Sequence, residues 1–580
     1  MKVIYSLLLV AWVLSVSAIT VSAADSKTES PVKIKKVIAD KVYKNGFIYT
    51  VDGLAQVAEA FAVKDGKFVA VGSNDAMKVV TGKDTEVIDL GKKMVMPGLA
   101  DSHIHALRGA LIKLGPQFPF SATPEEAAAA TAKFISDKKI KKGEWVEGGT
   151  WAFDYQTKGL LETLDKQTPD NPVILHDWTG HLVLVNSLAL KAAGFDKNTP
   201  NPVAGVIDRD ASGNPNGVLH DKALGLVYAK RTPWPADVLQ QQAKWIWNKV
   251  NSYGVVNIGL AQLDPNRLAA YRALEKKGEL TVRMKGHWDW NTRYVTASME
   301  EQAKTFLTPE KRGPKSALID VDGVKIYADG VASGHGAPYI EPYEDELTVG
   351  EQAIDEPTLT TWMMRFDAAG LQVMTHAFGD MSMRHWINAI EATRKHNGRS
   401  GIRHIVEHAC NTHPDDLPRL AALQDVIVDI SPYQLWIPDP ATESWFKLLG
   451  YDRMNQTYGI IGSWVRSGIT VSYGSDWDNV PEPDPWLAME GMVTRKAPGH
   501  PEYGRFNPDE RIDIETAIRI FTINGAINIM KEDVTGSIET GKSADFIVIN
   551  QNLLEIPSEK IHETKVLQTV LQGKTVYERK

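Results

Sequence analysis

The sequence predicts an α/β fold: a (β/α)8 barrel, a composite β-sandwich domain built from both ends of the chain, and an inserted α/β subdomain. Three observations predict it. β-type and helix-type segments alternate along the middle of the chain, which is typical of a parallel sheet. Polar residues repeatedly end the strand candidates, as they do where such a barrel places its chemistry. Both ends of the chain share a β-type texture.

The composition indicates a soluble, folded protein with more than one packed unit. The chain has 580 residues, of which 43% are hydrophobic and 23% charged, close to the average for globular proteins. Its 64 basic and 72 acidic residues give a net charge of −8, which argues against a dedicated nucleic-acid binder. The single cysteine, Cys410, excludes an intramolecular disulfide and a cysteine-based zinc knuckle.

The N-terminus predicts a secretory signal peptide over residues 1–23, followed by a linker over 24–38. Lys2 precedes an apolar stretch, and Val21-Ser22-Ala23 has the small-x-small pattern of a cleavage site. An uncleaved anchor is the alternative, but the apolar run is short and serine-interrupted for a span of ~20 residues. We therefore expect a periplasmic or secreted protein that makes no membrane contact after cleavage.

The composite β-sandwich domain is predicted over 39–96 and 531–580. In the first part, two β-type runs are joined by Asp65-Gly66, a hairpin signal because glycine adopts positive φ without steric cost. In the second part, a β-type run over 566–571 leads into a turn at Gln572-Gly573. We therefore expect the strands of both parts to belong to one small domain.

The barrel is predicted over 97–530, with an inserted subdomain at about 107–250, because that span is too long for one βα loop. Six strand candidates carry a polar residue at or next to their C-terminal end, and they lie at 94–103, 321–329, 371–376, 402–408, 426–430 and 469–476. Helix-like stretches such as 381–396 and 414–423 lie between them.

The strand ends carry ligand-type side chains. His103 and His105 are two residues apart, and residues i and i+2 of a strand face the same side, so both imidazoles can bind one ion. Lys325 lies within an apolar run, an awkward place for an unpaired charge. Later strand candidates end in His376, His408 and Asp476.

Four histidines and one carboxylate at successive strand ends suit one or two divalent ions. Imidazole together with carboxylate favours zinc over manganese, iron or nickel. His404 shares a strand face with His408, and we prefer His408 because it is nearer the C-terminal end of the strand.

These residues stand in segments that resemble the amidohydrolase superfamily, specifically its amidohydrolase-3 (YtcJ-like) branch, which includes N-substituted formamide deformylases. The segments are MPGLADSHIHA at 96–106, HDWTGHLVLVNSLAL at 176–190, VKIYADG at 324–330, THAFGD at 375–380, RHIVEHA at 403–409, GSDW at 474–477 and GSIETGKSADFIVIN at 536–550. The resemblance runs from about residue 40 to the C-terminus.

The resemblance implies a distorted (β/α)8 barrel and hydrolysis of a C–N bond in a linear or cyclic amide by metal-bound hydroxide. By resemblance, the metal-site positions are His103, His105, His376, His408 and Asp476, and Lys325 matches a bridging lysine that many members carboxylate. A bound cation lowers the pKa of its water toward about 7. Asp476 would then be the catalytic residue that accepts the water's proton and passes it to the leaving nitrogen.

An ammonium group at Lys325 would be repelled by divalent ions, so we expect this lysine to be carboxylated. A one-ion site with a neutral Lys325, or with Lys325 turned toward Asp329, is the alternative. Substrate contacts are predicted at His181, His335 and Trp477, each with a structural role as its alternative. His181 stands at a position typical of the branch, whereas the run around His335 departs from the branch's pattern.

The expected partner is a small amide-type molecule, with no nucleic acid. Two other functions stay open at this point. One is a deaminase that attacks a heterocycle by the same chemistry, and the other is a non-catalytic periplasmic regulatory or ligand-binding protein that retains the fold. The sequence leaves the oligomeric state open, with a homodimer among the candidates.

Overall fold

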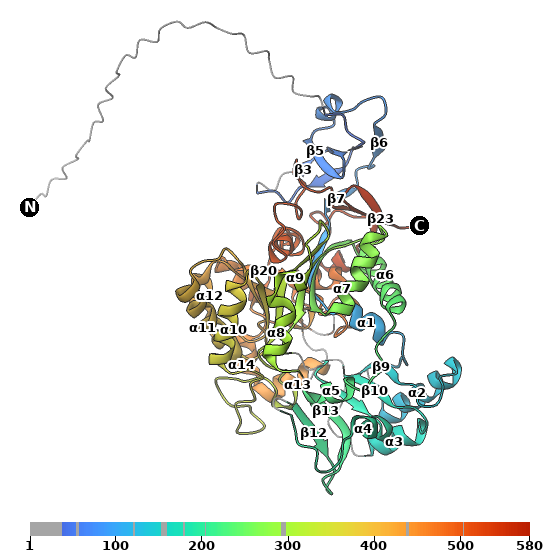
Figure 1. Ribbon diagram of the computed structural model, residues 1–580. Helices are drawn as coiled ribbons and strands as arrows, with labels where there is room; N and C mark the ends of the chain where they lie inside the picture. Colours follow the sequence, from blue (N-terminus) through green and yellow to red (C-terminus); the bar gives the residue numbers. More distant parts are fainter. Residues whose placement is uncertain are drawn as a thin grey trace, which may run out of the picture. The chain divides into compact units, whose positions relative to one another are not determined.

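In the computed structural model, eight parallel strands form a barrel at the centre of the chain (Figure 1). The strands follow one another in sequence order: β8 (Leu99–Ile104), β14 (Val255–Leu263), β15 (Arg283–Asp289), β16 (Ile319–Tyr327), β17 (Gln372–Ala377), β18 (His404–His408), β19 (Val426–Ile430) and β20 (Thr470–Tyr473). Backbone hydrogen bonds close the barrel beyond β20, because the Asp476 N–H donates to the His103 carbonyl at 2.8 Å. The predicted fold class is therefore confirmed.

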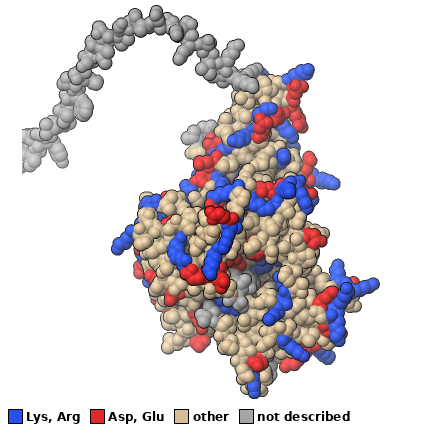
Figure 2. Space-filling model, viewed as in Figure 1, with Lys and Arg blue, Asp and Glu red and all other residues tan. Residues whose placement is uncertain are grey.

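The structure describes residues 37–53, 57–119, 122–151, 159–177, 180–202, 205–291, 297–436, 440–500, 502 and 504–580. The predicted signal peptide and almost all of the predicted linker lie outside the described residues. Among the described residues, no helix combines the length and apolarity needed to cross a bilayer. Figure 2 shows acidic and basic side chains interspersed over the face in view.

Helices follow the barrel strands and cover them. They include α1 (Ala106–Ile112), α6 (Ala236–Ser252), α7 (Pro265–Lys276), α8 (Met299–Leu307), α10 (Glu356–Ala368), α11 (Asp380–Asn397), α12 (Leu417–Leu423), α15 (Ile461–Arg466), α16 (Pro485–Thr494) and α17 (Ile514–Arg519). In α11, the predicted helix, Met383, Trp386, Ile387 and Ile390 recur at helical spacing and are buried in the main hydrophobic cluster. This helix ends at Gly398, whose φ of 80° suits glycine.

Strands from both ends of the chain form two further sheets (Figure 1). One contains β1 (Lys41–Lys44), β4 (Ala60–Lys64), β5 (Lys67–Gly72) and β6 (Glu86–Asp89). The other contains β2 (Phe47–Tyr49), β3 (Val57–Ala58), β7 (Met94–Pro97), β21 (Phe546–Ile549), β22 (Val566–Leu571) and β23 (Lys574–Glu578). Tyr43, Phe61 and Phe68 of the first sheet share one hydrophobic cluster with Phe546 of the second. The hairpin predicted at Asp65-Gly66 joins β4 to β5, and Gly66 has a φ of 75°.

A five-stranded sheet lies within the predicted insertion. Its strands are β9 (Val146–Trp151), β10 (Val173–Asp177), β11 (Leu182–Val185), β12 (Gly205–Arg209) and β13 (Pro215–Asp221), and α2 (Pro124–Lys138), α3 (Leu160–Gln167), α4 (Ser187–Ala193) and α5 (Ala223–Tyr228) accompany them. Separate hydrophobic clusters cover its two faces. The next helix, α6, buries Ile246 and Trp247 in the cluster of the barrel instead.

Candidate metal centre

All six predicted metal-site residues line one pocket at the C-terminal end of the barrel, and the predicted substrate residue His181 lines it with them. They come from different strands because parallel strands bring their C-terminal ends to one face of the barrel. The structure therefore brings together residues that are up to 373 positions apart (His103 to Asp476, 476 − 103) in the sequence.

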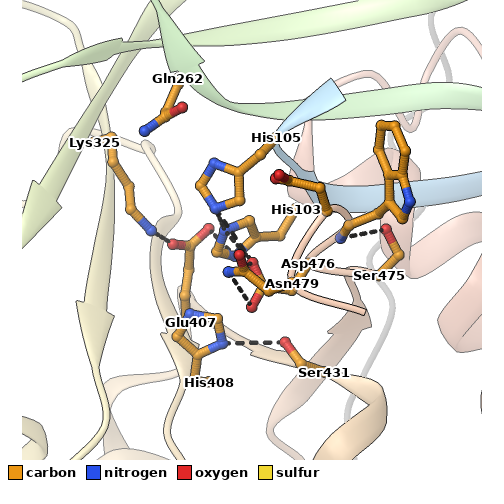
Figure 3. Close-up of polar contacts among 12 residues, drawn as sticks. His103, His105, Gln262, Lys325, Glu407, His408, Ser431, Ser475, Asp476 and Asn479 are labelled. Carbon is orange, nitrogen blue, oxygen red and sulfur yellow. Dashed lines mark hydrogen bonds and ion pairs between the residues drawn. The ribbon is translucent and has the colours of Figure 1, made fainter. Parts of the chain in front are cut away.

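Three donor atoms at this face form a small triangle (Figure 3). Nε2 of His103 lies 3.4 Å from Nε2 of His105, and Oδ1 of Asp476 lies 3.4 and 3.2 Å from these two nitrogens. Two atoms that each lie about 2.05 Å from one tetrahedral ion are about 3.3 Å apart. The triangle therefore has the spacing of three ligands of one ion. A ligand atom of His408 lies within 4.8 Å of those of His103 and Asp476.

His103 is held in the form that binds a cation. Its Nδ1 lies 2.9 Å from Oε1 of Glu407, and this carboxylate favours the tautomer with the hydrogen on Nδ1, which leaves a lone pair on Nε2. Burial, followed by the positive charge of Lys325, lowers the pKa of His103 well below its usual value. A neutral imidazole is the form that ligates metals. His103 lies within β8, whereas His105 follows the strand as the residue before α1, so the two histidines meet at the C-terminal end of β8.

His408 is oriented by hydroxyl groups. Its Nδ1 lies 2.7 Å from Oη of Tyr433 and 3.1 Å from Oγ of Ser431. The Tyr433 hydroxyl donates to Oδ2 of Asp476 at 3.3 Å, so its oxygen accepts the Nδ1–H of His408 and Nε2 keeps a lone pair. Burial lowers the pKa of His408 to about 3 and raises that of Tyr433 well above its usual value, so both groups are neutral.

His376 is oriented by a buried carboxylate. Its Nδ1 lies 2.7 Å from Oδ1 of Asp329, which also accepts the backbone N–H groups of Phe378 and Gly379. These bonds fix the carboxylate and, through it, the imidazole ring.

Glu407 is a site residue that the sequence analysis missed. It is fully buried and forms an ion pair with the equally buried Lys325, besides its contact with His103 (Figure 3). Strand alternation puts Glu407 and His408 on opposite faces, so only one of them was expected inside. His408 has a φ of 66°, which interrupts the regular strand alternation. The side chains of Glu407 and His408 can therefore both lie on the inner side of the barrel. The feature of the sequence that could have identified Glu407 is a carboxylate within an apolar strand.

Strained backbone marks the same place. His408, Ala409 and Asp476 have φ values of 66°, 43° and 53°, in the left-handed region that non-glycine residues seldom adopt. Such conformations gather at functional sites, where the surrounding structure holds them.

Two predicted substrate residues lie elsewhere. Nε2 of His335 lies 3.1 Å from Oδ1 of Asp345, and the imidazole packs against Tyr343 outside the pocket lining. The ring of Trp477 points away from the pocket toward Gly109 and Trp245. Each was chosen for its neighbours in the sequence, which do not determine the direction of a side chain.

Pocket residues that were not predicted include Arg108, Gln262 and Asn479. The Asn479 amide donates to both carboxylate oxygens of Asp476 at 3.2 Å and accepts from Arg108 at 2.7 Å. No local pattern marks these three polar residues, because their partners are distant in the sequence.

A parallel barrel whose C-terminal face carries converging histidines and a carboxylate defines a class of barrel hydrolases. The family model described as the amidohydrolase family matches residues 86–577. The chain therefore belongs to the amidohydrolase family.

Curated relatives match over most of their length. YtcJ of Bacillus subtilis (strain 168) is 30% identical over 93% of this chain and 99% of its own. The N-substituted formamide deformylase of Arthrobacter pascens is 24% identical over 93% and 98%. The exoenzymes regulatory protein AepA of Pectobacterium carotovorum is 25% identical over 75% and 93%.

Solved structures agree on the fold. An uncharacterized metal-dependent hydrolase from Pyrococcus horikoshii OT3 matches with a TM-score of 0.70 at 20% identity, over 89% of this chain and 99% of its own. An adenosine deaminase from Xanthomonas campestris with bound zinc matches with a TM-score of 0.53 at 12% identity, over 93% and 94%. At these identities the likeness shows the fold alone.

Proposed function

We propose that this protein is an exported metal-dependent hydrolase that cleaves the C–N bond of a linear or cyclic amide. The observation that carries the proposal is the triangle of His103 Nε2, His105 Nε2 and Asp476 Oδ1, which has the spacing of ligands around one ion. Imidazole and carboxylate donors fit zinc. A divalent cation bound there supplies Lewis acidity and a nucleophile at neutral pH.

Asp476 has two roles, because it contributes a ligand to the ion and accepts the proton of the attacking water. Oδ1 belongs to the triangle, whereas Oδ2 accepts hydrogen bonds from Tyr433 and Asn479. These donors fix the carboxylate beside the reacting atoms, where it accepts the proton of the attacking water and passes it to the leaving nitrogen. Tyr433 remains a hydrogen-bond donor throughout, since burial raises the pKa of its hydroxyl well above its usual value.

The charge on Lys325 and the number of ions are linked through Glu407. As an ammonium, Lys325 neutralises Glu407, and one divalent ion completes the site. A carboxylated Lys325 would instead place a second anion against Glu407, and a second divalent ion would offset the two units of charge that this change removes. Lys325→Ala, assayed with and without acetate, separates the two forms. The bridging form predicts loss of metal and activity that acetate partly restores, and the ammonium form predicts no rescue.

A regulatory role is the second candidate, favoured by the similarity to AepA, which is named as a regulatory protein. Deamination is tested with it. The zinc-loaded mature protein is offered a panel of linear and cyclic amides and amino-heterocycles, and amine and ammonia release are measured. We expect amine release from amides. Ammonia release from heterocycles alone would indicate a deaminase, and tight binding without turnover across the panel would indicate a regulator.

Export rests on the N-terminal sequence, where an apolar stretch precedes Val21-Ser22-Ala23. N-terminal sequencing of the exported fraction is expected to begin at or near Ala24. Recovery of Met1 from that fraction would contradict cleavage.

A further inference from the structure

A second cavity adjoins the metal pocket. Its volume is about 480 Å³, within the range of about 300 to 1,000 Å³ that is usual for small-molecule sites. The metal pocket itself has about 30 Å³, room for an ion and one or two waters, since one water needs about 10 to 15 Å³. A substrate whose scissile bond lies at the triangle therefore keeps most of its atoms outside the metal pocket.

The two cavities meet at Arg108, which lines both of them. Its guanidinium donates to Oδ1 of Asp478 and to Oδ1 of Asn479, each at 2.7 Å, so this shared wall is fixed. At the end of β14, Gln262 lines the metal pocket and the next residue, Leu263, lines the second cavity. Two separate elements, α1 and β14, therefore place the cavities side by side.

Helix α1 sets the distance between the triangle and the second cavity. It lies beside α6 and β9 (Figure 1). His105 is the residue before this helix, Arg108 follows three residues later, and Leu111, three residues further, lines the second cavity. At about 1.5 Å per residue, Leu111 lies about 9 Å along α1 from His105. An extended chain of about eight atoms spans this distance, since three backbone atoms cover about 3.5 Å.

The second cavity lies between the inserted sheet and the barrel, and aromatic rings form part of its wall. Glu147 of β9 lines it on one side, together with Trp234 from the segment before α6. On the barrel side, Trp288 of β15 and Phe306 of α8 are stacked with ring centroids 6.2 Å apart. The indole N–H of Trp288 already donates to the Val321 carbonyl at 2.9 Å. These rings therefore offer apolar surface to a ligand.

The charged side chains of this wall are paired with one another. Each arginine that lines the cavity lies within 3.3 Å of a carboxylate, and the pairs are Arg108–Asp478, Arg231–Glu147 and Arg267–Asp264. The carboxylate of Asp289 acts on Arg267 as well, and Glu301 is exposed to solvent. A charged ligand would have to compete with these pairs, whereas a neutral apolar group leaves them intact.

We propose that the second cavity binds a neutral aryl or alkyl group that the substrate carries about 9 Å from its scissile bond, so that the enzyme selects amides of this kind. The inference rests on the proposed function and names the substrate class of the same site. Removing the group from water supplies binding energy, about fourfold in affinity for each methylene.

Helix α8 offers a variant and its control at neighbouring positions. Thr305 is half-buried and lines the cavity, whereas Lys304 is exposed and stands outside the lining. Thr305→Trp places an indole in the cavity, and Lys304→Trp places the same ring on the surface.

The test uses two series of amides, in which a linear apolar group of growing length stands on the acyl carbon or on the nitrogen. For the wild type we expect kcat/KM to rise about fourfold per methylene in one series once the group reaches the cavity, mainly through a lower KM. Thr305→Trp should flatten this rise, and Lys304→Trp should leave it as in the wild type. A flat profile in both series, or an unchanged rise in Thr305→Trp, would overturn the inference while amide hydrolysis stands.

Trp234→Ala removes part of the aromatic wall and should lower kcat/KM for the longest amide by about 10-fold, even if Thr305→Trp does not fold. Analogues whose apolar group ends in an ammonium or a carboxylate should lose the gain, and an equal gain with either would refute a neutral ligand. Calorimetric binding of both series to the zinc-loaded protein separates the claims. The same dependence of affinity on length without any turnover would contradict the proposed function and support the cavity as a binding site.

Discussion

The two ends of the barrel both bury charged groups, but they arrange them differently. At the N-terminal ends of the strands, buried cations lie next to carboxylates. Arg283 pairs with Asp545, and Lys531 pairs with Asp320 at 2.9 Å. At the C-terminal ends, donor atoms from several strands converge on one place instead, within 3.4 Å of one another.

The difference is energetic. At the lower end, formed by the N-terminal ends of the strands, Arg283 and Asp320 each have a partner of opposite charge within the protein. These contacts stabilise the fold, and the partners Asp545 and Lys531 tie the C-terminal segment to the barrel. At the upper end Nε2 of His103 faces Oδ1 of Asp476 at 3.4 Å, although both atoms are acceptors. Such an arrangement is unfavourable without a cation. One end therefore serves stability, and the other serves binding and chemistry.

Removing a member of the triangle should have the largest effect on activity. We expect His103→Ala and Asp476→Asn each to lower kcat/KM by about a thousandfold or more, because the ion and the proton acceptor act in the transition state. Thermal unfolding followed by circular dichroism should still show a cooperative transition within a few degrees of the wild type. Turnover near the wild-type rate in either variant would mean that the chemistry lies elsewhere.

Metal removal should change only the C-terminal end of the barrel, where the three ligand atoms converge. Dialysis against a chelator is expected to abolish hydrolysis, and added zinc should restore it. The melting temperature should fall on removal and rise again with zinc, since a ligand bound only by the folded state stabilises it. Full activity in protein shown by elemental analysis to be metal-free would refute the proposed centre.

Breaking the lower end should reduce stability and spare the chemistry. Arg283→Ala leaves Asp545 buried without its cation, which should cost about 3 to 5 kcal/mol in the free energy of unfolding. Urea denaturation measures this loss, and kcat/KM of the folded protein should stay within about twofold of the wild type. The double variant Arg283→Met with Asp545→Leu should recover much of the stability. A loss of activity at unchanged stability would contradict the assignment of this end of the barrel to stability.

The smallest effect is expected from Glu407, which touches the triangle through His103. Glu407→Gln keeps the shape but weakens the hold on the Nδ1–H of His103 and on Lys325. We expect the dissociation constant for zinc to rise by about 10- to 100-fold, measured by competition with a chromogenic chelator. An unchanged dissociation constant would show that this contact does not control the ligand.

The sequence predicted what depends on local pattern. The strand ends that carry His376, His408 and Asp476 were predicted from apolar runs that stop at a polar residue. Two barrel strands, β14 and β15, were not recognised. In β15, Arg283, Lys285 and His287 interrupt the apolar run, and the first two are buried only because Asp545 and Asp320 offset their charges.

Long-range partners and backbone turns explain the other differences. Glu407 was missed because strand alternation allows only one inward side chain of two neighbours, and the left-handed backbone at His408 removes that restriction. Asp221, whose Oδ1 lies 2.8 Å from Nδ1 of His181, is 40 residues away from it, on a strand of the inserted sheet. Such pairings depend on the tertiary fold, which no local pattern specifies.

The most direct test of the central claim is a crystal structure of the zinc-loaded protein with diffraction data on both sides of the zinc absorption edge. We predict an anomalous peak at about 2.0 to 2.2 Å from Nε2 of His103, Nε2 of His105 and an oxygen of Asp476. A peak bound by other residues, or no peak at the triangle in crystals of protein that elemental analysis shows to contain zinc, would contradict the account.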